Sequence, residues 1–206
     1  KVFHKQNPQE AIIIPFDNEN DEKINVEIFE DTCEAVEVGK KQNEWFSDIL
    51  QTKCKLVYMP DDTKRPVDKK YAANEETTSF TDGYPILMIG QSSLDNLNEK
   101  LTEALPMDRF RPNIVFTGGH AYIEDEIASF EINKINFKGV KLCSRCVMTT
   151  INQQTGEKAK EPLKTLATYR MKNNKIYFGQ NVLHQQTGQI NTGDEIKITT
   201  RKEPLL

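Results

Sequence analysis

The chain has 206 residues, and its 27 Lys and Arg residues against 31 Asp and Glu residues give a formal net charge of -4 at pH 7. With no overall positive field to attract nucleic acid or an anionic membrane surface, we expect no nucleic-acid partner. Hydrophobic residues make up 37% of the chain and charged residues 28%, as in globular proteins, and no apolar run approaches the roughly 20 residues of a membrane span.

The four cysteines are too few for a secreted disulfide scaffold. We therefore expect a reducing, cytoplasmic location. The first residue is Lys1 rather than Met, which suggests either a processed product or an excised piece whose upstream residues are absent.

The first part of the chain combines strand-like and helix-like patterns. Residues 11–15 and 23–29 are predicted to form a half-buried hairpin, with residues 17–21 as its turn. Residues 40–52 carry apolar positions at helical spacing, whereas residues 60–79 have no period and predict a long exposed loop.

The second part is predicted to be mainly strands. A helix after the strand at residues 84–89 would begin at Ser92, with Asp95 completing a capping box, and Pro162 would start a second helix. Further strands are expected at residues 113–116, 129–135, 139–142, 147–151, 175–178 and 195–199. Closely spaced strands with few helical crossovers favour an α+β, β-rich fold, a mixed or antiparallel β-barrel decorated by helices.

The strongest chemical signal is the CSRC segment, residues 143–146, where two thiols flank a cation. Cys33 and Cys54 do not supply the second ligand pair of a structural zinc site. A dithiol redox motif favours a helix after its first cysteine, whereas residues 147–151 predict a strand. Two interpretations remain: one thiolate that ligates a metal while Arg145 pairs with a cofactor anion, or two cysteines that pack as small apolar side chains.

Two other segments could bind an anion. Arg109 and Arg111 lie in a predicted loop, and Pro112 would fix the approach so that Asn113 can offer its amide to a ring edge. The hydroxyls and free amides at residues 92–93 could receive a phosphate. The alternatives are solvated loop arginines and an ordinary helix cap.

Several segments match one family when they are taken in order. They are DGYP at 82–85, SSL at 92–94, FRPNIV at 110–115, CSRCVMTTI at 143–151, TG at 155–156 and EPLKTL at 161–166. The chain resembles the MOSC domain family, named for the C-terminal domain of molybdenum cofactor sulfurase, and most closely its amidoxime-reducing type. The resemblance implies a MOSC-type β-barrel at residues 61–206 and a partial N-terminal MOSC subdomain at residues 1–60.

The resemblance also implies a binding site for a pyranopterin molybdenum cofactor, Mo-molybdopterin. Cys146 would be the catalytic residue and the molybdenum ligand, while Ser144 and Arg145 would hold the cofactor. Arg111 and Asn113 would contact its phosphate or pterin side. The implied cofactor-binding set is completed by Ser92, Ser93 and Asn181.

Some positions depart from the family pattern. Relatives have a Thr-Ser pair where this chain has Ser92 and Ser93, and a Tyr where it has Asn181, which removes an aromatic contact. Relatives also bind the cofactor phosphate with residues whose counterparts would lie upstream of Lys1.

The implied activity is reduction of N-hydroxylated or N-oxygenated small molecules. Electrons would come from a separate haem, flavin or ferredoxin-type protein, because this chain lacks ferredoxin cysteine spacing. The alternative is a non-catalytic carrier that delivers the molybdenum cofactor, or a persulfide sulfur, to another enzyme. A pyridoxal-phosphate activity is disfavoured, because cofactor sulfurases keep it in a separate domain.

Overall fold

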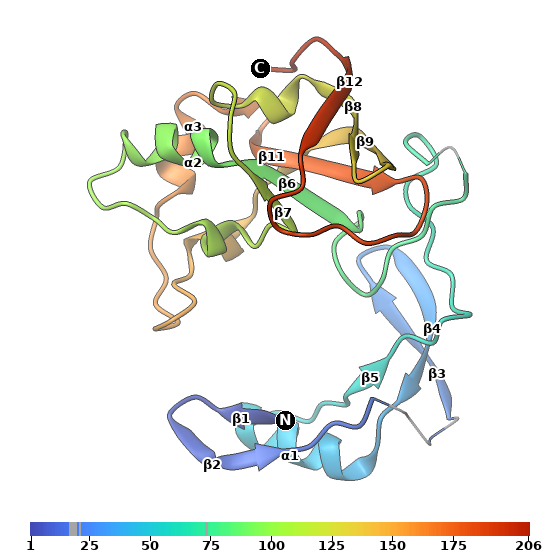
Figure 1. Cartoon of the computed structure of the whole chain (residues 1–206). Coiled ribbons are helices and arrows are strands. Elements are labelled where there is room, and N and C mark those ends of the chain that lie inside the picture. The colour runs from blue at the N-terminus through green and yellow to red at the C-terminus, as the bar shows by residue number, and fades with distance from the viewer. Residues whose placement is uncertain (17–19, 21, 73) are drawn as a thin grey trace. The chain divides into compact units, whose positions relative to one another are not determined.

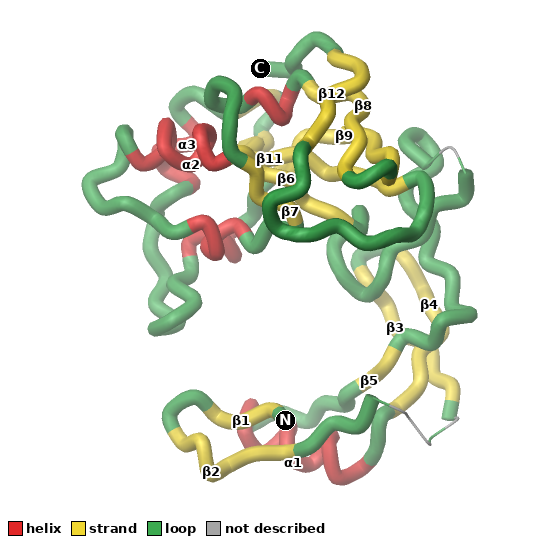
Figure 2. The backbone as a smooth tube through the Cα atoms, in the orientation of Figure 1, coloured by secondary structure: helices red, strands yellow, loops and turns green. Residues whose placement is uncertain are grey.

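The structure is a computed structural model that divides the chain into two compact units (Figure 1). It describes residues 1–16, 20, 22–72 and 74–206. The first unit comprises Lys1–Pro66 and Thr77–Asp82, and the second comprises Val67–Glu76 and Gly83–Leu206. Each unit has its own sheets, as the tube in Figure 2 shows. None of the helices among the described residues is long and apolar enough to cross a membrane.

The first unit contains two small antiparallel sheets and a helix. Its elements are β1 (Val2–His4), β2 (Asn7–Ile12), β3 (Lys23–Ile28), β4 (Asp31–Glu37), α1 (Lys40–Leu50) and β5 (Val57–Tyr58). β1 pairs with β2, and β4 pairs with both β3 and β5. The predicted hairpin between residues 11–15 and 23–29 is therefore wrong, whereas the helix predicted from Lys40 is confirmed. The turn predicted at residues 17–21 lies outside the described residues, apart from residue 20.

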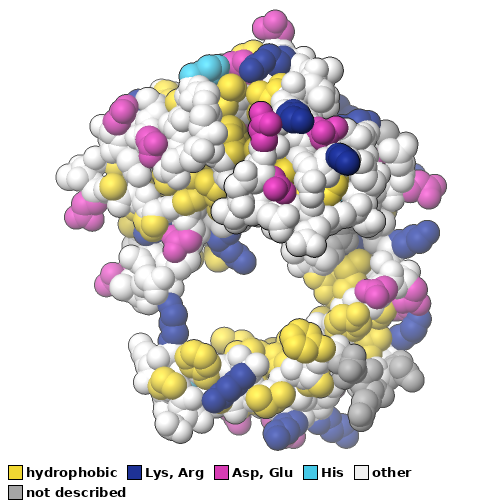
Figure 3. Space-filling model, viewed as in Figure 1, with side chains coloured by type: hydrophobic (Ala, Val, Ile, Leu, Met, Phe, Trp, Pro, Cys, Tyr) yellow, Lys and Arg dark blue, Asp and Glu magenta, His cyan; other side chains and the backbone are white. Residues whose placement is uncertain are grey.

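The surface of the first unit carries several apolar side chains (Figure 3). They are Phe3, Ile13, Phe16, Phe29, Leu50 and Tyr58.

Arg65 is buried inside the segment predicted to be an exposed loop, residues 60–79. The Arg65 side chain is 2% exposed. Its Nε–H donates to Asp31 Oδ2 at 2.8 Å, and its Nη1 donates to the carbonyl oxygens of Ser79 at 2.9 Å and Thr81 at 2.8 Å. A buried guanidinium is tolerated when it is paired in this way. The prediction of exposure is thus wrong at Arg65.

The second unit is built on one seven-stranded sheet that curls into half a barrel (Figures 1 and 2). Its strands are β6 (Ile86–Gly90), β7 (Ile114–Phe116), β8 (Ile127–Ile132), β9 (Ile135–Ser144), β10 (Met171–Lys172), β11 (Lys175–His184) and β12 (Ile196–Arg201). The strand order is β12-β8-β9-β11-β6-β7, with β10 paired to β11, and only the β6–β7 pair is parallel. The predicted β-rich, mixed architecture is confirmed.

Helices cover one face of this sheet. They are α2 (Gln91–Asn98), α3 (Leu163–Ala167) and the 3-10 helices η1 (Met107–Phe110), η2 (Ile123–Asp125) and η3 (Val147–Thr150). Because successive strand residues point to opposite faces, Met88 and Ile89 of β6 enter different clusters. Met88 packs with Phe130, whereas Ile89 packs beneath the helices with Leu94 and Phe178.

η3 replaces the strand predicted at residues 147–151. The Thr149 hydroxyl donates to the Cys146 carbonyl at 3.0 Å, and the Thr150 hydroxyl donates to the Val147 carbonyl at 2.7 Å. Such local side-chain bonds compete with strand pairing. The β-branched composition was therefore a misleading signal here.

The start of α2 also differs from the prediction. Its N-cap residue is Gly90, no side chain caps it, and Ser92 lies in the first turn. Asp95 accepts a hydrogen bond from Gln91 Nε2 at 2.8 Å instead of completing a capping box.

The β8–β9 hairpin turns at Asn133 and Lys134, which lie inside the strand predicted at residues 129–135. The φ angles of Asn133 and Lys134 are 47° and 67°, and positive values at both central residues are typical of the favoured two-residue hairpin turn.

Gln180 of β11 crosses β9 in the interior of the sheet. Its Nε2 donates to the carbonyl of Ile127 at 2.7 Å, and the side chain is fully buried. A Cβ added at Gly139 would lie 1.6 Å from Gln180 Nε2 and 2.4 Å from the Ile127 oxygen. This close approach requires glycine at position 139.

Candidate functional site

The FRPN segment, residues 110–113, connects η1 to β7. Arg111 is exposed and has a left-handed backbone, with φ 54°. The Asn113 N–H donates to the Leu87 carbonyl at 2.9 Å, and Asn113 Oδ1 accepts the Leu87 N–H at 2.8 Å. The side chain thus extends the pairing of β6 with β7, and no described residue accepts a hydrogen bond from Asn113 Nδ2. Asn113 is exposed, so this amide can reach a ligand.

The CSRC segment connects β9 to η3 and separates its two thiols. Cys143 is buried, as expected for a packed cysteine, whereas Cys146 is exposed at the N-cap of η3. The Cys146 carbonyl accepts from Thr149, which fixes the backbone beside the thiol. Ser144 is the last residue of β9 and is exposed. Of the two thiols only that of Cys143 is packed in the interior, where its Sγ also accepts a hydrogen bond from Arg145 Nη1, so neither cysteine packs as a purely apolar side chain.

Arg145 joins the CSRC segment to the FRPN segment. Its Nη2 donates to the Phe110 carbonyl at 2.8 Å, and its Nη1 donates to Cys143 Sγ at 2.9 Å. The guanidinium carbon lies 5.7 Å from the centroid of the Phe110 ring, and the Arg145 N–H donates to the Ile176 carbonyl at 2.7 Å. Arg145 Nε is buried without a partner among the described residues. The structure thus brings the two segments together.

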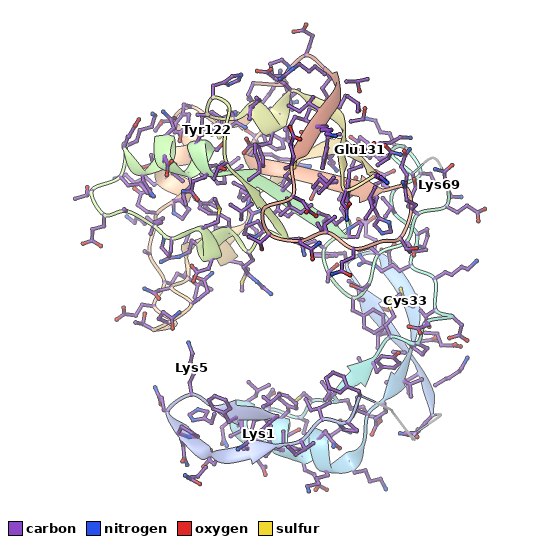
Figure 4. All side chains as sticks on the ribbon, viewed as in Figure 1. Lys1, Lys5, Cys33, Lys69, Tyr122 and Glu131 are labelled. Atoms are coloured by element: carbon purple, nitrogen blue, oxygen red, sulfur yellow. The ribbon has the colours of Figure 1, made fainter. Side chains whose placement is uncertain are left out.

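Ser93 of α2 lies in the interior, although the resemblance assigns it to the cofactor. Its hydroxyl donates to Glu124 Oε2 at 2.8 Å and accepts the Tyr122 N–H at 2.7 Å. Ser93 and Glu124 are both fully buried, and burial raises the pKa of Glu124. Figure 4 shows Tyr122 beside α2. No hydrogen bond of the described residues links Ser93 to either segment.

Ser92 and Asn181 are placed differently. The Ser92 hydroxyl donates to the Gly119 carbonyl at 3.0 Å. Asn181 of β11 is half-buried and lies opposite Leu87 on one side and Lys141 on the other. Asn181 and Asn113 are therefore separated by the single strand β6, because Leu87 of that strand is a neighbour of both.

Lys141 is a cation near the site that the sequence analysis missed. Its Nζ lies 5.5 Å from the ring centroid of Tyr71 and 5.7 Å from that of Tyr84. Burial raises the pKa of Tyr84 to about 12. The alternation of β9 could have indicated Lys141, because residues 141 and 143 share one face of a strand.

The model of the MOSC domain matches residues 75–197, which contain both the FRPN and the CSRC segments. The chain belongs to the MOSC domain family. The resemblance found in the sequence is thereby confirmed, and the match covers most of the curled sheet of this MOSC protein.

Curated relatives of this MOSC protein carry two kinds of name. Mitochondrial amidoxime-reducing component 1 of Danio rerio is 30% identical over 201 residues, covering 92% of this chain and 62% of the relative. The protein of the same name from Xenopus laevis is 29% identical over 194 residues, covering 87% of this chain and 57% of the relative. Molybdenum cofactor sulfurase of Oryza sativa subsp. japonica is 32% identical over 171 residues, covering 75% of this chain and 21% of the relative. The chain thus spans about 60% of the two amidoxime-reducing relatives and about a fifth of the sulfurase.

Proposed function

We propose that this MOSC protein binds a pyranopterin molybdenum cofactor through Cys146 and reduces N-hydroxylated or N-oxygenated small molecules. The observation that carries the proposal is the Arg145 bridge, which joins the segment of an exposed thiol to the FRPN segment. The names of the relatives, an amidoxime-reducing component and a molybdenum cofactor sulfurase, support the same cofactor chemistry.

The donor set fits this cofactor. Within the part of the chain that the structure describes, no group of three or more His, Cys, Asp or Glu side chains could hold a metal ion. A metal at the CSRC segment would therefore have the Cys146 thiolate as its protein ligand and would need further ligands from a cofactor. When bound, the pyranopterin cofactor supplies dithiolene sulfurs and a metal centre capable of two-electron chemistry.

Four polar residues of the two segments then have distinct roles beside that of Cys146. Arg111 is the exposed guanidinium that would pair with the cofactor phosphate, and Asn113 Nδ2 would donate to the pterin edge. Arg145 positions both segments, because its two Nη atoms already bind Phe110 and Cys143. Ser144 offers an exposed hydroxyl. We keep Ser92 and Asn181 in the proposed site and leave the interior Ser93 out of it.

The proposed reaction requires an electron donor. Because no disulfide joins the four cysteines and only Cys143 and Cys146 are close in sequence, we propose that a separate haem, flavin or ferredoxin-type protein supplies the electrons. The reduced thiols fit a cytoplasm-like compartment, although the amidoxime-reducing relatives are named mitochondrial. Fractionation of cells that express the tagged native protein decides the location.

The test compares Cys146→Ala with Cys143→Ala in protein expressed in a host that makes the cofactor. We expect Cys146→Ala to abolish bound molybdenum, measured by elemental analysis, and to abolish benzamidoxime reduction with a reduced dye as donor. The control Cys143→Ala removes the bond between Arg145 and Cys143 Sγ but should retain molybdenum, because Arg145 keeps its bond to the Phe110 carbonyl and the proposed ligand Cys146 is unchanged. Unchanged molybdenum and turnover in Cys146→Ala would refute the proposal.

The exposure of Cys146 also favours a second candidate, a carrier of the cofactor or of a persulfide. A cofactor carrier would contain the metal and show no reductase turnover with dye. A persulfide carrier would also lack turnover, and mass spectrometry would find an additional sulfur on Cys146.

A further inference from the structure

A pocket in the second unit is lined by none of the residues proposed to hold the cofactor. Its walls come from the segment after α2, from η1, from the segment after η3 and from α3, and its volume is about 1130 Å³. The lining residues used below are Lys100, Leu105, Arg109, Lys158, Lys164 and Tyr169. None of the residues in the FRPN or CSRC segments lines it. The pocket is large enough for a small organic molecule.

Arg109 gives this pocket a buried positive charge. Its side chain is 7% exposed, and its Nε is buried without a partner. Across the described residues, no atom accepts a hydrogen bond from the Arg109 guanidinium. The buried Arg65 and Arg170 differ, because Arg65 pairs with Asp31 and Arg170 Nη2 donates to Asp125 Oδ2 at 2.6 Å. Burial of the unpaired Nε is unfavourable, and the two Nη atoms, which are not buried, are free to pair with an anion in the pocket.

The Arg109 backbone is held in place. Its N–H donates to the Pro106 carbonyl at 3.2 Å within η1. The side-chain amide of Gln153 donates to the carbonyls of Asp108 at 3.1 Å and Arg109 at 3.4 Å. Because the backbone of Arg109 is fixed, less conformational entropy is lost when its guanidinium binds a ligand.

The remaining charges of the pocket favour an anion near Arg109. Four cationic residues line it, Lys100, Arg109, Lys158 and Lys164, against three acidic residues, Glu103, Glu157 and Glu161. Glu157 already accepts the Thr155 hydroxyl at 3.1 Å, and Glu161 accepts the Thr165 N–H at 3.0 Å. Lys158 and Lys164 are exposed and have no ion-pair partner among the described residues, so both can approach a ligand.

One wall of the pocket is apolar. Leu105 and Tyr169 are half-buried and line the pocket, and Lys100 Nζ lies 5.3 Å from the centroid of the Tyr169 ring. A ligand that uses the whole pocket would combine an anionic group with a carbon skeleton. The three cations Arg109, Lys158 and Lys164 favour a dianion over a singly charged carboxylate. The planar guanidinium of Arg109 also matches the spacing of two phosphate oxygens.

We infer that this pocket binds a small organic phosphate, with its phosphoryl group paired to Arg109, Lys158 and Lys164 and its carbon skeleton against Leu105 and Tyr169. The site is independent of the molybdenum proposal, since Arg111 and Cys146 take no part in it.

The test uses the full chain without cofactor and phenyl phosphate as the probe, with binding measured by calorimetry. We expect saturable binding of phenyl phosphate and none of phenol. Arg109→Gln should weaken binding at least about tenfold, the scale of one lost charge-assisted pair. Lys164→Gln should weaken it several-fold without affecting folding, because Lys164 is exposed. The control Arg111→Gln should leave the affinity unchanged.

Three results would overturn the inference. One is the absence of saturable phenyl phosphate binding to the wild-type chain. Another is unchanged binding in Lys164→Gln and in folded Arg109→Gln. The third is a loss of binding in Arg111→Gln, which would assign the phosphate to the cofactor site. Benzoate binding as tight as that of phenyl phosphate would replace the phosphate assignment with a carboxylate.

Discussion

Ser93→Ala separates an interior role of this serine from the cofactor role that the family resemblance implies. The hydroxyl of Ser93 is fully buried, donates to Glu124 Oε2 and accepts the Tyr122 N–H. Its removal would leave a carboxyl oxygen and an N–H each short of one partner. At about 1–2 kcal/mol for each group, the free energy of unfolding of the second unit should fall by about 2–4 kcal/mol.

The assay can follow the two units separately. The single tryptophan, Trp45, lies on α1, so its fluorescence reports on the first unit. Tyr122, Tyr169 and Tyr177 lie in the second unit and contribute to near-ultraviolet circular dichroism. Urea unfolding of Ser93→Ala should therefore lower the midpoint of the tyrosine signal. The matched control is Ser92→Ala, which loses a single bond to a carbonyl and should cost about 0.5–1.5 kcal/mol.

One outcome would refute this reasoning. If Ser93→Ala keeps the wild-type midpoint of the tyrosine signal but loses molybdenum during purification, its hydroxyl serves the ligand. The interior hydrogen bonds would then contribute little to stability.

Two further predictions concern the same unit. Burial raises the pKa of Glu124 above its ordinary 4.5, so the folded protein keeps a proton that the unfolded chain loses. The stability contributed by this group is therefore full below pH 4.5 and falls as the pH rises towards the folded pKa. Glu124→Gln should flatten this decline in urea midpoints measured from pH 4.5 upward, and an unchanged slope would contradict it. Gly139→Ala should cost more than about 3 kcal/mol, because its Cβ would overlap Gln180 and the Ile127 carbonyl. Thermal melting checks this against Gly83→Ala, where an added Cβ meets nothing within 4 Å, and equal melting temperatures would disprove it.

Local patterns predicted much of the fold. Apolar spacing located α1, and the density of strands gave the correct class. The pairing of β3 with β4 was missed because its turn, Phe29 and Glu30, contains no glycine, proline or asparagine, although Phe29 has φ 57°. A phenylalanine with a positive φ angle cannot be recognised from the amino-acid sequence by the usual turn residues.

The candidate site was harder to predict from spacing. The bond between Arg145 and the Phe110 carbonyl joins residues 35 positions apart, and only the family resemblance suggested that their segments meet. The interior place of Ser93 depends on Glu124, which follows it by 31 positions. A helix-start serine has the same local sequence whether it faces a ligand or a buried carboxyl.

The Arg145 bridge affects how family motifs can be used. One guanidinium ties the loop before β7 to the loop after β9, so this arginine has a structural task even when no ligand is bound. A relative that had lost its metal chemistry would still need the arginine to keep both loops in place. Searches for active members of the family should therefore give more weight to the exposed thiol at position 146 than to its cationic neighbour.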